Sequence, residues 1–373
     1  MTRENGEALG AGLDAWPESI HGMVDLSCVD CHADPAAAEM PHPAQLDPPD
    51  CSACHSDAAE QHATSVHGAT VTLGEGSGVA AACWDCHGAH DVLPSSDPES
   101  RTSHFAVPKT CGQCHSEPHS AGEGTATTPG AAVCFDASVH GHALLGAGLR
   151  VAPNCATCHG SHQIRRPSDP ESRVHRAAIP DTCGSCHEAI RRQYADSVHG
   201  ALADAGNTVA AICTDCHTYH QIGSPDLADW KVDVIGECGT CHEESLETYR
   251  DTFHGQVTSL GFARVATCSG CHGSHDILPK DAPGSRVSVE RRLATCQECH
   301  TRAGPNFVQY DPHPKPEDAE RDAKLYYTGQ FMKVLLIGVF SFFFLHTALW
   351  LPRSFKARRE HHRRPSDRFS NPR

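Results

Sequence analysis

Cysteine and histidine recur along this 373-residue chain in one fixed arrangement: two Cys separated by two residues, with His directly after the second. Two thiols at this spacing can add across the two vinyl groups of one haem, which places the adjacent His under the iron as an axial ligand. The arrangement occurs ten times and uses 20 of the 21 cysteines, so it predicts ten covalently bound c-type haems. The attachment cysteines are Cys28, Cys31, Cys51, Cys54, Cys83, Cys86, Cys111, Cys114, Cys155, Cys158, Cys183, Cys186, Cys213, Cys216, Cys238, Cys241, Cys268, Cys271, Cys296 and Cys299. The axial histidines are His32, His55, His87, His115, His159, His187, His217, His242, His272 and His300.

Two other uses of paired cysteines fit this pattern less well. Zinc sites also use Cys-x-x-Cys, but they do not require His directly after the second Cys, and here it follows all ten times. Disulfides within Cys-x-x-Cys would close tight loops and would connect nothing distant in the chain.

A second set of histidines recurs in register with the motifs and could occupy the other face of each iron. In every unit, Ser or Thr, one residue and His-Gly precede two haem motifs, and in four units a further His lies three residues after the first motif. The first unit lacks this further His, and His42 is the nearest substitute, with His62, His104, His119, His142, His175 and His313 as alternatives. The predicted second ligands are His21, His67, His140, His199, His254, His90, His162, His220, His275 and His42.

The number of second ligands decides between electron transfer and catalysis. An iron held by two histidines has no open position, whereas an iron with one protein ligand can bind and reduce a small molecule. Ten second ligands for ten haems predict an electron-transfer protein and not an enzyme. The alternative is a terminal reductase of a nitrogen or sulfur oxyanion at a five-coordinate haem. A haem-bearing filament subunit is a third interpretation.

The repeats divide the chain and indicate its fold. Residues 16–303 form five units of two haem motifs, after an N-terminal extension over 1–15. Gly and Pro punctuate the units, so we expect loops and short helices packed around a chain of ten haems. The segments after His187 and His242 are expected to be helices that run from one unit into the next. Only 39% of residues are hydrophobic, so the haems must supply much of the interior.

The C-terminal part has a different composition. Residues 304–330 form a linker, 331–352 a transmembrane helix and 353–373 a basic tail. Residues 1–330 carry a net charge of −23 and residues 331–373 of +7, which excludes nucleic acid as a partner of the large acidic part. The positive-inside rule places the tail in the cytoplasm and the haem array on the periplasmic side of the cytoplasmic membrane. Residues 1–20 contain no apolar segment of a signal peptide, so we expect the natural chain to begin further upstream.

His346 lies inside the apolar segment. An ionisable residue in a membrane helix indicates a function. It could contact haem b of a partner, bind a quinone, or hydrogen-bond a neighbouring helix.

The combination of haem motifs with SxHG and CHGxH over residues 16–303 resembles the pentahaem and decahaem periplasmic cytochromes. These include the electron donor of cytochrome c nitrite reductase and the decahaem conduits of metal-reducing bacteria. The resemblance implies a multihaem cytochrome c fold, stacked haems with two axial histidines each, and electron transfer without chemistry of its own. Soluble members lack the C-terminal anchor. The stretch HTALWLPR is similar to multihaem subunits that pair with a membrane cytochrome b, which implies a quinone-reactive membrane partner and an extracytoplasmic redox protein.

Overall fold

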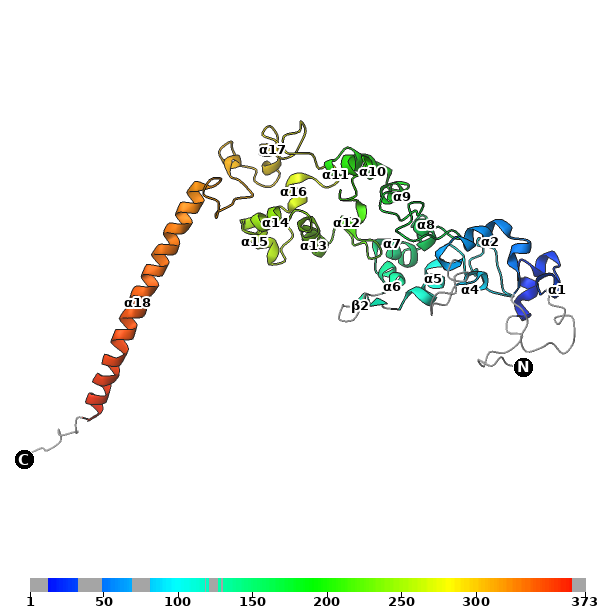
Figure 1. The fold of residues 1–373 in the computed structure, drawn as a ribbon, viewed down its shortest axis with the longest axis horizontal. Coiled ribbons are helices and arrows are strands. Elements are labelled where there is room, and N and C mark those ends of the chain that lie inside the picture. Colours follow the sequence, from blue (N-terminus) through cyan, green and yellow to red (C-terminus); the bar gives the residue numbers. More distant parts are fainter. Residues whose placement is uncertain are drawn as a thin grey trace, which may run out of the picture.

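The structure, a computed structural model, describes residues 13–32, 49–68, 81–117, 119–120, 127–128 and 130–363. Short helices and loops form an elongated, curved row that starts at the N-terminal end and leads to one long helix at the C-terminal end (Figure 1). The prediction of loops, short helices and one long apolar C-terminal helix is confirmed for these residues.

The bounds of the elements follow the repeats. The α-helices of the array are α1 Cys28–Cys31, α2 Ser56–Ala63, α4 Cys83–His87, α5 Val107–His115, α6 Ala131–Asp136, α7 Val139–Gly141, α8 Cys155–His159, α9 Ile179–Gly184, α10 Glu188–Ala195, α11 Val198–Asp204, α12 Cys213–His217, α13 Ala228–Gly239, α14 Glu243–Arg250, α15 Phe253–Ser259, α16 Cys268–His272 and α17 Arg292–Gln297. The 3₁₀ turns are η1 Leu13–Glu18, η2 Gly22–Val24, η4 Cys51–Ala53 and η6 Phe307–Gln309, and η5 His142–Gly146 is a π-helix. The strands β1 His119–Ser120 and β2 Thr127–Thr128 pair antiparallel, with His119 opposite Thr128.

Each unit places its two haem motifs on different parts of a helix. The first motif starts its own short helix, as in α4, α8, α12 and α16. In three units the residue before the second Cys is Asp, and its carboxylate accepts a hydrogen bond from the backbone N–H just ahead of the first Cys, for example Asp85 from Ala82 at 2.7 Å and Asp215 from Ile212 at 2.8 Å. Such a cap gives a partner to a backbone N–H at the start of the helix that has none within the helix. From unit two on, the second motif begins near the C-terminal end of a helix that starts ahead of it. The helix α5 contains the whole motif, whereas α13 ends after the first two motif residues.

The interior of the described protein contains few apolar side chains. Its buried hydrophobic residues are Ala132, Leu144, Ala152, Tyr194, Ala210, Ile212, Ile235 and Tyr249. Buried Ser, Thr and Asn are more numerous, and apart from Leu144 the most completely buried side chains are serines. A polypeptide with so little apolar core needs another source of stability, such as a large apolar cofactor.

The segments after His187 and His242 differ from the expected single helices. Each consists of two helices, α10 and α11 after His187, and α14 and α15 after His242. The breaks fall at Ser197 and Thr252, whose hydroxyls accept the backbone N–H of Gly200 and Gly255 at 3.0 and 3.2 Å. A side chain in this N-cap position starts a new helix and so interrupts the preceding one.

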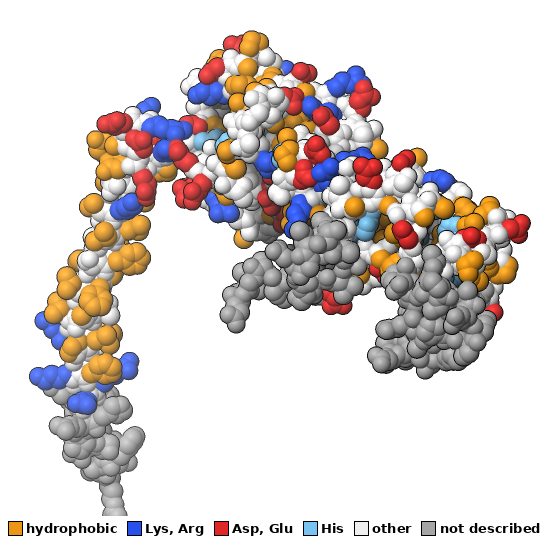
Figure 2. Space-filling model, turned by 45° about the vertical axis from the view of Figure 1, so that its right-hand side comes forward, with side chains coloured by type: hydrophobic (Ala, Val, Ile, Leu, Met, Phe, Trp, Pro, Cys, Tyr) orange, Lys and Arg blue, Asp and Glu red, His pale blue; other side chains and the backbone are white. Residues whose placement is uncertain are grey.

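The long helix α18, Ala323–Arg363, projects from the last unit (Figure 1). It is the one helix in the described part of the chain that is long and apolar enough to cross a membrane. None of its apolar stretch is buried. Figure 2 shows apolar side chains along its length, with Lys and Arg gathered toward its far end. The helix extends beyond the predicted span of 331–352 in both directions.

Candidate haem-binding row

The Ser/Thr-x-His-Gly segments form one recurring turn. The hydroxyl at the first position donates a hydrogen bond to the carbonyl three residues before it, as Ser138 does to Phe135 at 2.6 Å and Ser197 to Tyr194 at 2.7 Å. The same oxygen accepts the N–H of the glycine three residues later, at 3.0 Å in both segments. These hydroxyl side chains are between 0% and 4% exposed in all five units. The turn therefore fixes the backbone of the intervening histidine.

Glycine closes this turn because no other side chain fits there. A Cβ placed on Gly200 would lie 1.8 Å from the carbonyl oxygen of Tyr194, and one on Gly141 would lie 2.1 Å from that of Phe135. Real Cβ atoms do not approach an oxygen so closely. The same conflict occurs at Gly22, Gly68 and Gly255. The glycine is thus required because the turn has no space for a side chain, and it takes no part in ligand binding.

Backbone hydrogen bonds join the turns of units one to four to the next unit. The residue after the Ser donates its N–H to a carbonyl two residues beyond the His of the following CHxxH segment. The four bonds measure 2.8 to 2.9 Å and are Ile20 to Val92, Val66 to Ile164, Val139 to Ile222 and Val198 to Ile277. These bonds hold each CHxxH histidine beside the unit that precedes its own in the sequence.

Ten pairs of histidine rings result, each containing one haem-motif histidine. Their ring centroids are 5.9 to 6.3 Å apart. The His-Gly histidine faces the second motif of its own unit, and the CHxxH histidine faces the first motif of the preceding unit. The pairs are His21–His55, His32–His90, His67–His115, His87–His162, His140–His187, His159–His220, His199–His242, His217–His275, His254–His300 and His272–His313.

This separation fits a metal ion held between two imidazoles. A metal–nitrogen bond of about 2 Å on each side, with roughly 1 Å from each nitrogen to its ring centre, separates the centroids by about 6 Å. Within the residues that the structure describes, no group of three or more His, Cys, Asp or Glu side chains could hold a metal ion. Zinc needs about four such ligands, whereas the iron of a haem takes four from the porphyrin and two from the protein. The residues present therefore fit haem and not zinc.

The protonation of these rings suits coordination. Burial, followed by the neighbouring His162, lowers the pKa of His87. Burial and then His242 lower the pKa of His199 in the same way. A neutral imidazole carries the lone pair that a metal ion requires, so a lowered pKa keeps the ligand form available at neutral pH.

The attachment cysteines of successive motifs are neighbours along the whole row. Burial raises the pKa of the Cys51 thiol to about 11, and Cys83 of the next unit adds to the rise. Interactions of this kind connect all nine successive motif pairs: Cys31 with Cys54, Cys51 with Cys83, Cys86 with Cys111, Cys111 with Cys155, Cys158 with Cys183, Cys183 with Cys213, Cys216 with Cys238, Cys238 with Cys268 and Cys271 with Cys296. The spatial order of the motifs thus follows their order in the sequence.

The structure places the candidate histidines for the tenth second ligand in different surroundings. His42 lies outside the described residues, and His313 takes the place opposite the last unpaired motif histidine. His62 and His104 instead make hydrogen bonds to the carbonyls of Ala81 and Ala152, both at 2.9 Å. His62 thus connects α2 to the segment ahead of the Cys83 motif, and His104 connects two loops.

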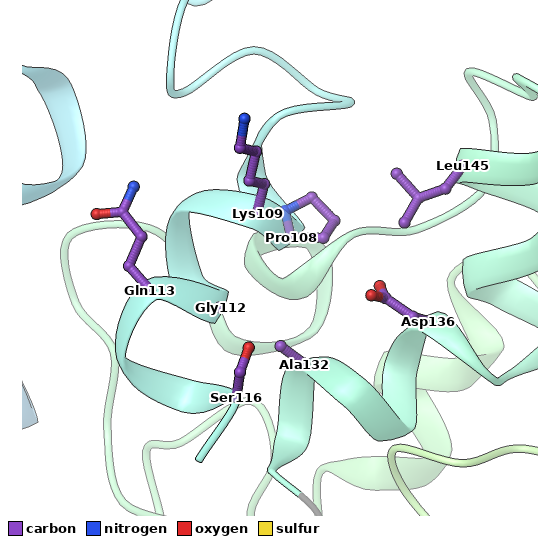
Figure 3. A pocket seen from close by; sticks show the side chains of 8 residues that line it. All are labelled: Pro108, Lys109, Gly112, Gln113, Ser116, Ala132, Asp136 and Leu145. Atoms are coloured by element: carbon purple, nitrogen blue, oxygen red, sulfur yellow. The ribbon is translucent and has the colours of Figure 1, made fainter.

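One pocket lies between α5 and α6 (Figure 3). Its lining includes Lys109, Asp136 and Leu145. Gly112 and Gln113 of the Cys111 haem motif also line it, whereas none of the attachment cysteines or paired histidines does.

In a comparison with known proteins, the N-terminal part of the array matches one family. Residues 20–116 match the family model of cytochrome c3. This stretch contains the first four haem motifs with His21, His67 and His90. The cytochrome c3 match supports a multihaem c-type cytochrome with covalently attached haem, a class that generally transfers electrons. No curated protein and no solved structure matches the chain.

Proposed function

We propose that this chain transfers electrons through ten covalently attached haems, between a quinone-reactive membrane partner such as a cytochrome b and an extracytoplasmic redox protein. When bound, haem iron supplies the one-electron chemistry, which these side chains do not provide. The observation that carries the proposal is the set of ten histidine pairs, 5.9 to 6.3 Å between centroids, on a row of neighbouring attachment cysteines.

The polypeptide's part is to hold and to space the haems. Two imidazoles per site leave no position for a substrate, which favours electron transfer over the reductase alternative. All ten second histidines come from the same chain, so no second copy is needed to complete a site. This also favours a discrete carrier over a filament subunit.

The position of α18 suggests which end of the row meets the membrane. Unit five is the unit nearest to the helix in the sequence, so its haems would lie nearest to the bilayer and unit one would face the soluble partner (Figure 1). The basic tail would lie in the cytoplasm and the array in the periplasm. On α18, the His346 ring stacks on Phe342 with centroids 6.3 Å apart, and we assign it to contact with haem b or quinone of the partner.

The test is the stoichiometry and spin state of purified full-length protein. We expect ten haem irons per chain, a wholly low-spin ferric spectrum, and no binding of carbon monoxide after reduction. Zinc in place of iron, or clearly fewer than ten haems, would overturn the proposal. Uptake of carbon monoxide or nitrite by the wild-type protein would support the reductase instead.

A further inference from the structure

The first haem motif of unit five has no following repeat to complete it. In units one to four the partner ring comes from the CHxxH segment of the next unit, as His275 of unit five faces His217 of unit four. After unit five the repeats end. The ring that faces His272 belongs to His313, with centroids 6.3 Å apart.

A short folded segment, residues 304–322, presents His313, and we name it the strap. The Asp311 carboxylate accepts the backbone N–H of His313 at 2.9 Å, and Arg321 donates to the His313 carbonyl at 2.9 Å and to Asp311 at 3.2 Å. Lys315 forms an ion pair with Glu244 of α14. Prolines on both sides of His313 restrict its backbone further. The strap thus holds one histidine against unit five.

Thr248 of α14 sets which nitrogen of His313 is available. Its hydroxyl lies 3.0 Å from Nδ1 of His313, and 3.0 and 3.1 Å from the carbonyl oxygens of Glu244 and Ser245. The single hydroxyl proton goes to these carbonyls, so the Thr248 oxygen accepts a hydrogen bond from the Nδ1–H of His313. Nε2 is then the unprotonated nitrogen and can bind a metal ion.

We propose that His313 is the second axial ligand of the iron attached at Cys268 and Cys271, opposite His272. The assignment rests on the proposed function, because it requires haem at this motif. The strap therefore caps the row with a ligand from outside the repeats. Because α18 begins at Ala323, directly after the strap, the segment that completes this site also leads into the apolar helix.

The experiment replaces His313 with Ala in the full-length, haem-loaded protein. We expect one haem in ten to become high-spin, about one carbon monoxide to bind per reduced chain, and added imidazole to restore the low-spin spectrum. The matched control is His62→Gln, which keeps a hydrogen-bond donor toward Ala81 and should leave all haems low-spin. His275→Ala serves as the positive control, because it should open the site at His217.

The outcomes distinguish the two proposals. If His313→Ala stays fully low-spin while His275→Ala binds carbon monoxide, His313 is not the ligand and the electron-transfer proposal stands. If the wild-type protein already binds carbon monoxide, the electron-transfer proposal itself fails. Should the Ala variant not accumulate, His313→Met provides a second measurement, because Met is also an axial ligand. It should keep the spectrum low-spin and raise the midpoint potential of one haem. Unchanged potentials in this variant would also overturn the assignment.

Discussion

The buried Ser197 hydroxyl in its SxHG turn donates to one carbonyl and accepts from one N–H, so both its donor and its acceptor have a partner. In the absence of a large apolar core, such small buried turns determine where the ligand histidines lie. The glycine that completes the turn leaves no room for any side chain. Substitutions at this position should therefore act on haem binding through the backbone.

Gly200→Ala tests this steric requirement. The added methyl group would meet the Tyr194 carbonyl, so we expect a loss of at least about 2 kcal/mol in the free energy of unfolding and a weakened His199 ligand. Gly236→Ala is the matched control, because nothing lies within 4 Å of its Cβ in the middle of α13. It should be neutral or slightly stabilising. Thermal unfolding of both variants measures the difference, and equal melting temperatures would contradict the steric argument.

The buried histidines predict loss of stability in acid. Burial lowers the pKa of His199 and of His254 below 6.5, so the unfolded chain binds protons on these rings at a pH where the folded chain does not. The stabilisation is fully present above pH 6.5 and is lost as the pH falls through the lower folded-state pKa. Iron coordination acts in the same direction. Unfolding by denaturant between about pH 8 and about pH 5 should show stability falling with acid, and a rise would refute this.

Among the elements, an arginine connects units three and four. Arg176 donates to both carboxylate oxygens of Asp215 at 3.0 and 2.7 Å, and to the carbonyls of Thr208 and Ala210 at 2.9 and 2.8 Å. Asp215 also caps α12, which carries the haem motif of Cys213. The planar Arg176 guanidinium binds four acceptor oxygens and so fixes the position of α12, which carries one haem motif. Lysine cannot make this set of hydrogen bonds.

Arg176→Lys should cost about 1–2 kcal/mol, discounted because the pair is about one third exposed. The matched control is Arg192→Lys, whose partner Glu188 lies on the same exposed helix face, and it should cost less than about 0.5 kcal/mol. Denaturant unfolding of the haem-loaded variants supplies both values. If the two substitutions lower the free energy of unfolding equally, the Arg176–Asp215 link stabilises the protein no more than an exposed ion pair does.

Local spacing explains how much of this site the sequence could predict. Haem motifs and SxHG turns are short-range patterns, so their residues were identifiable without a structure. The pairing was not, because His90 and His32 are 58 residues apart and only the folded row joins them. Unit one lacks a CHxxH histidine, which predicts His42 as its substitute, and His42 lies outside the described residues. In the structure each CHxxH histidine faces the unit before its own, so His272 of unit five has no such partner, and His313 faces it instead.

At the scale of the whole molecule, α18 should attach an otherwise water-soluble array to a membrane. Its 41 residues span about 60 Å, twice the roughly 30 Å of a bilayer core, so several turns stand outside the lipid. A chain that ends after Asp322 should be soluble without detergent and keep ten low-spin haems, since it retains the strap. Membrane fractionation and spectroscopy of this truncation provide the check. Sedimentation of the truncated chain with membranes would contradict an anchoring role for α18.

The proposed backward donation of ligands has a consequence for biosynthesis. A chain that emerges from its N-terminus presents His32 before His90 exists, and His272 before His313. The leading motif of every unit must therefore wait for the next stretch of polypeptide before its ligand set closes. On this ordering, maturation would advance unit by unit behind the export machinery, and its last step would come as the residues just ahead of the apolar helix leave the translocon.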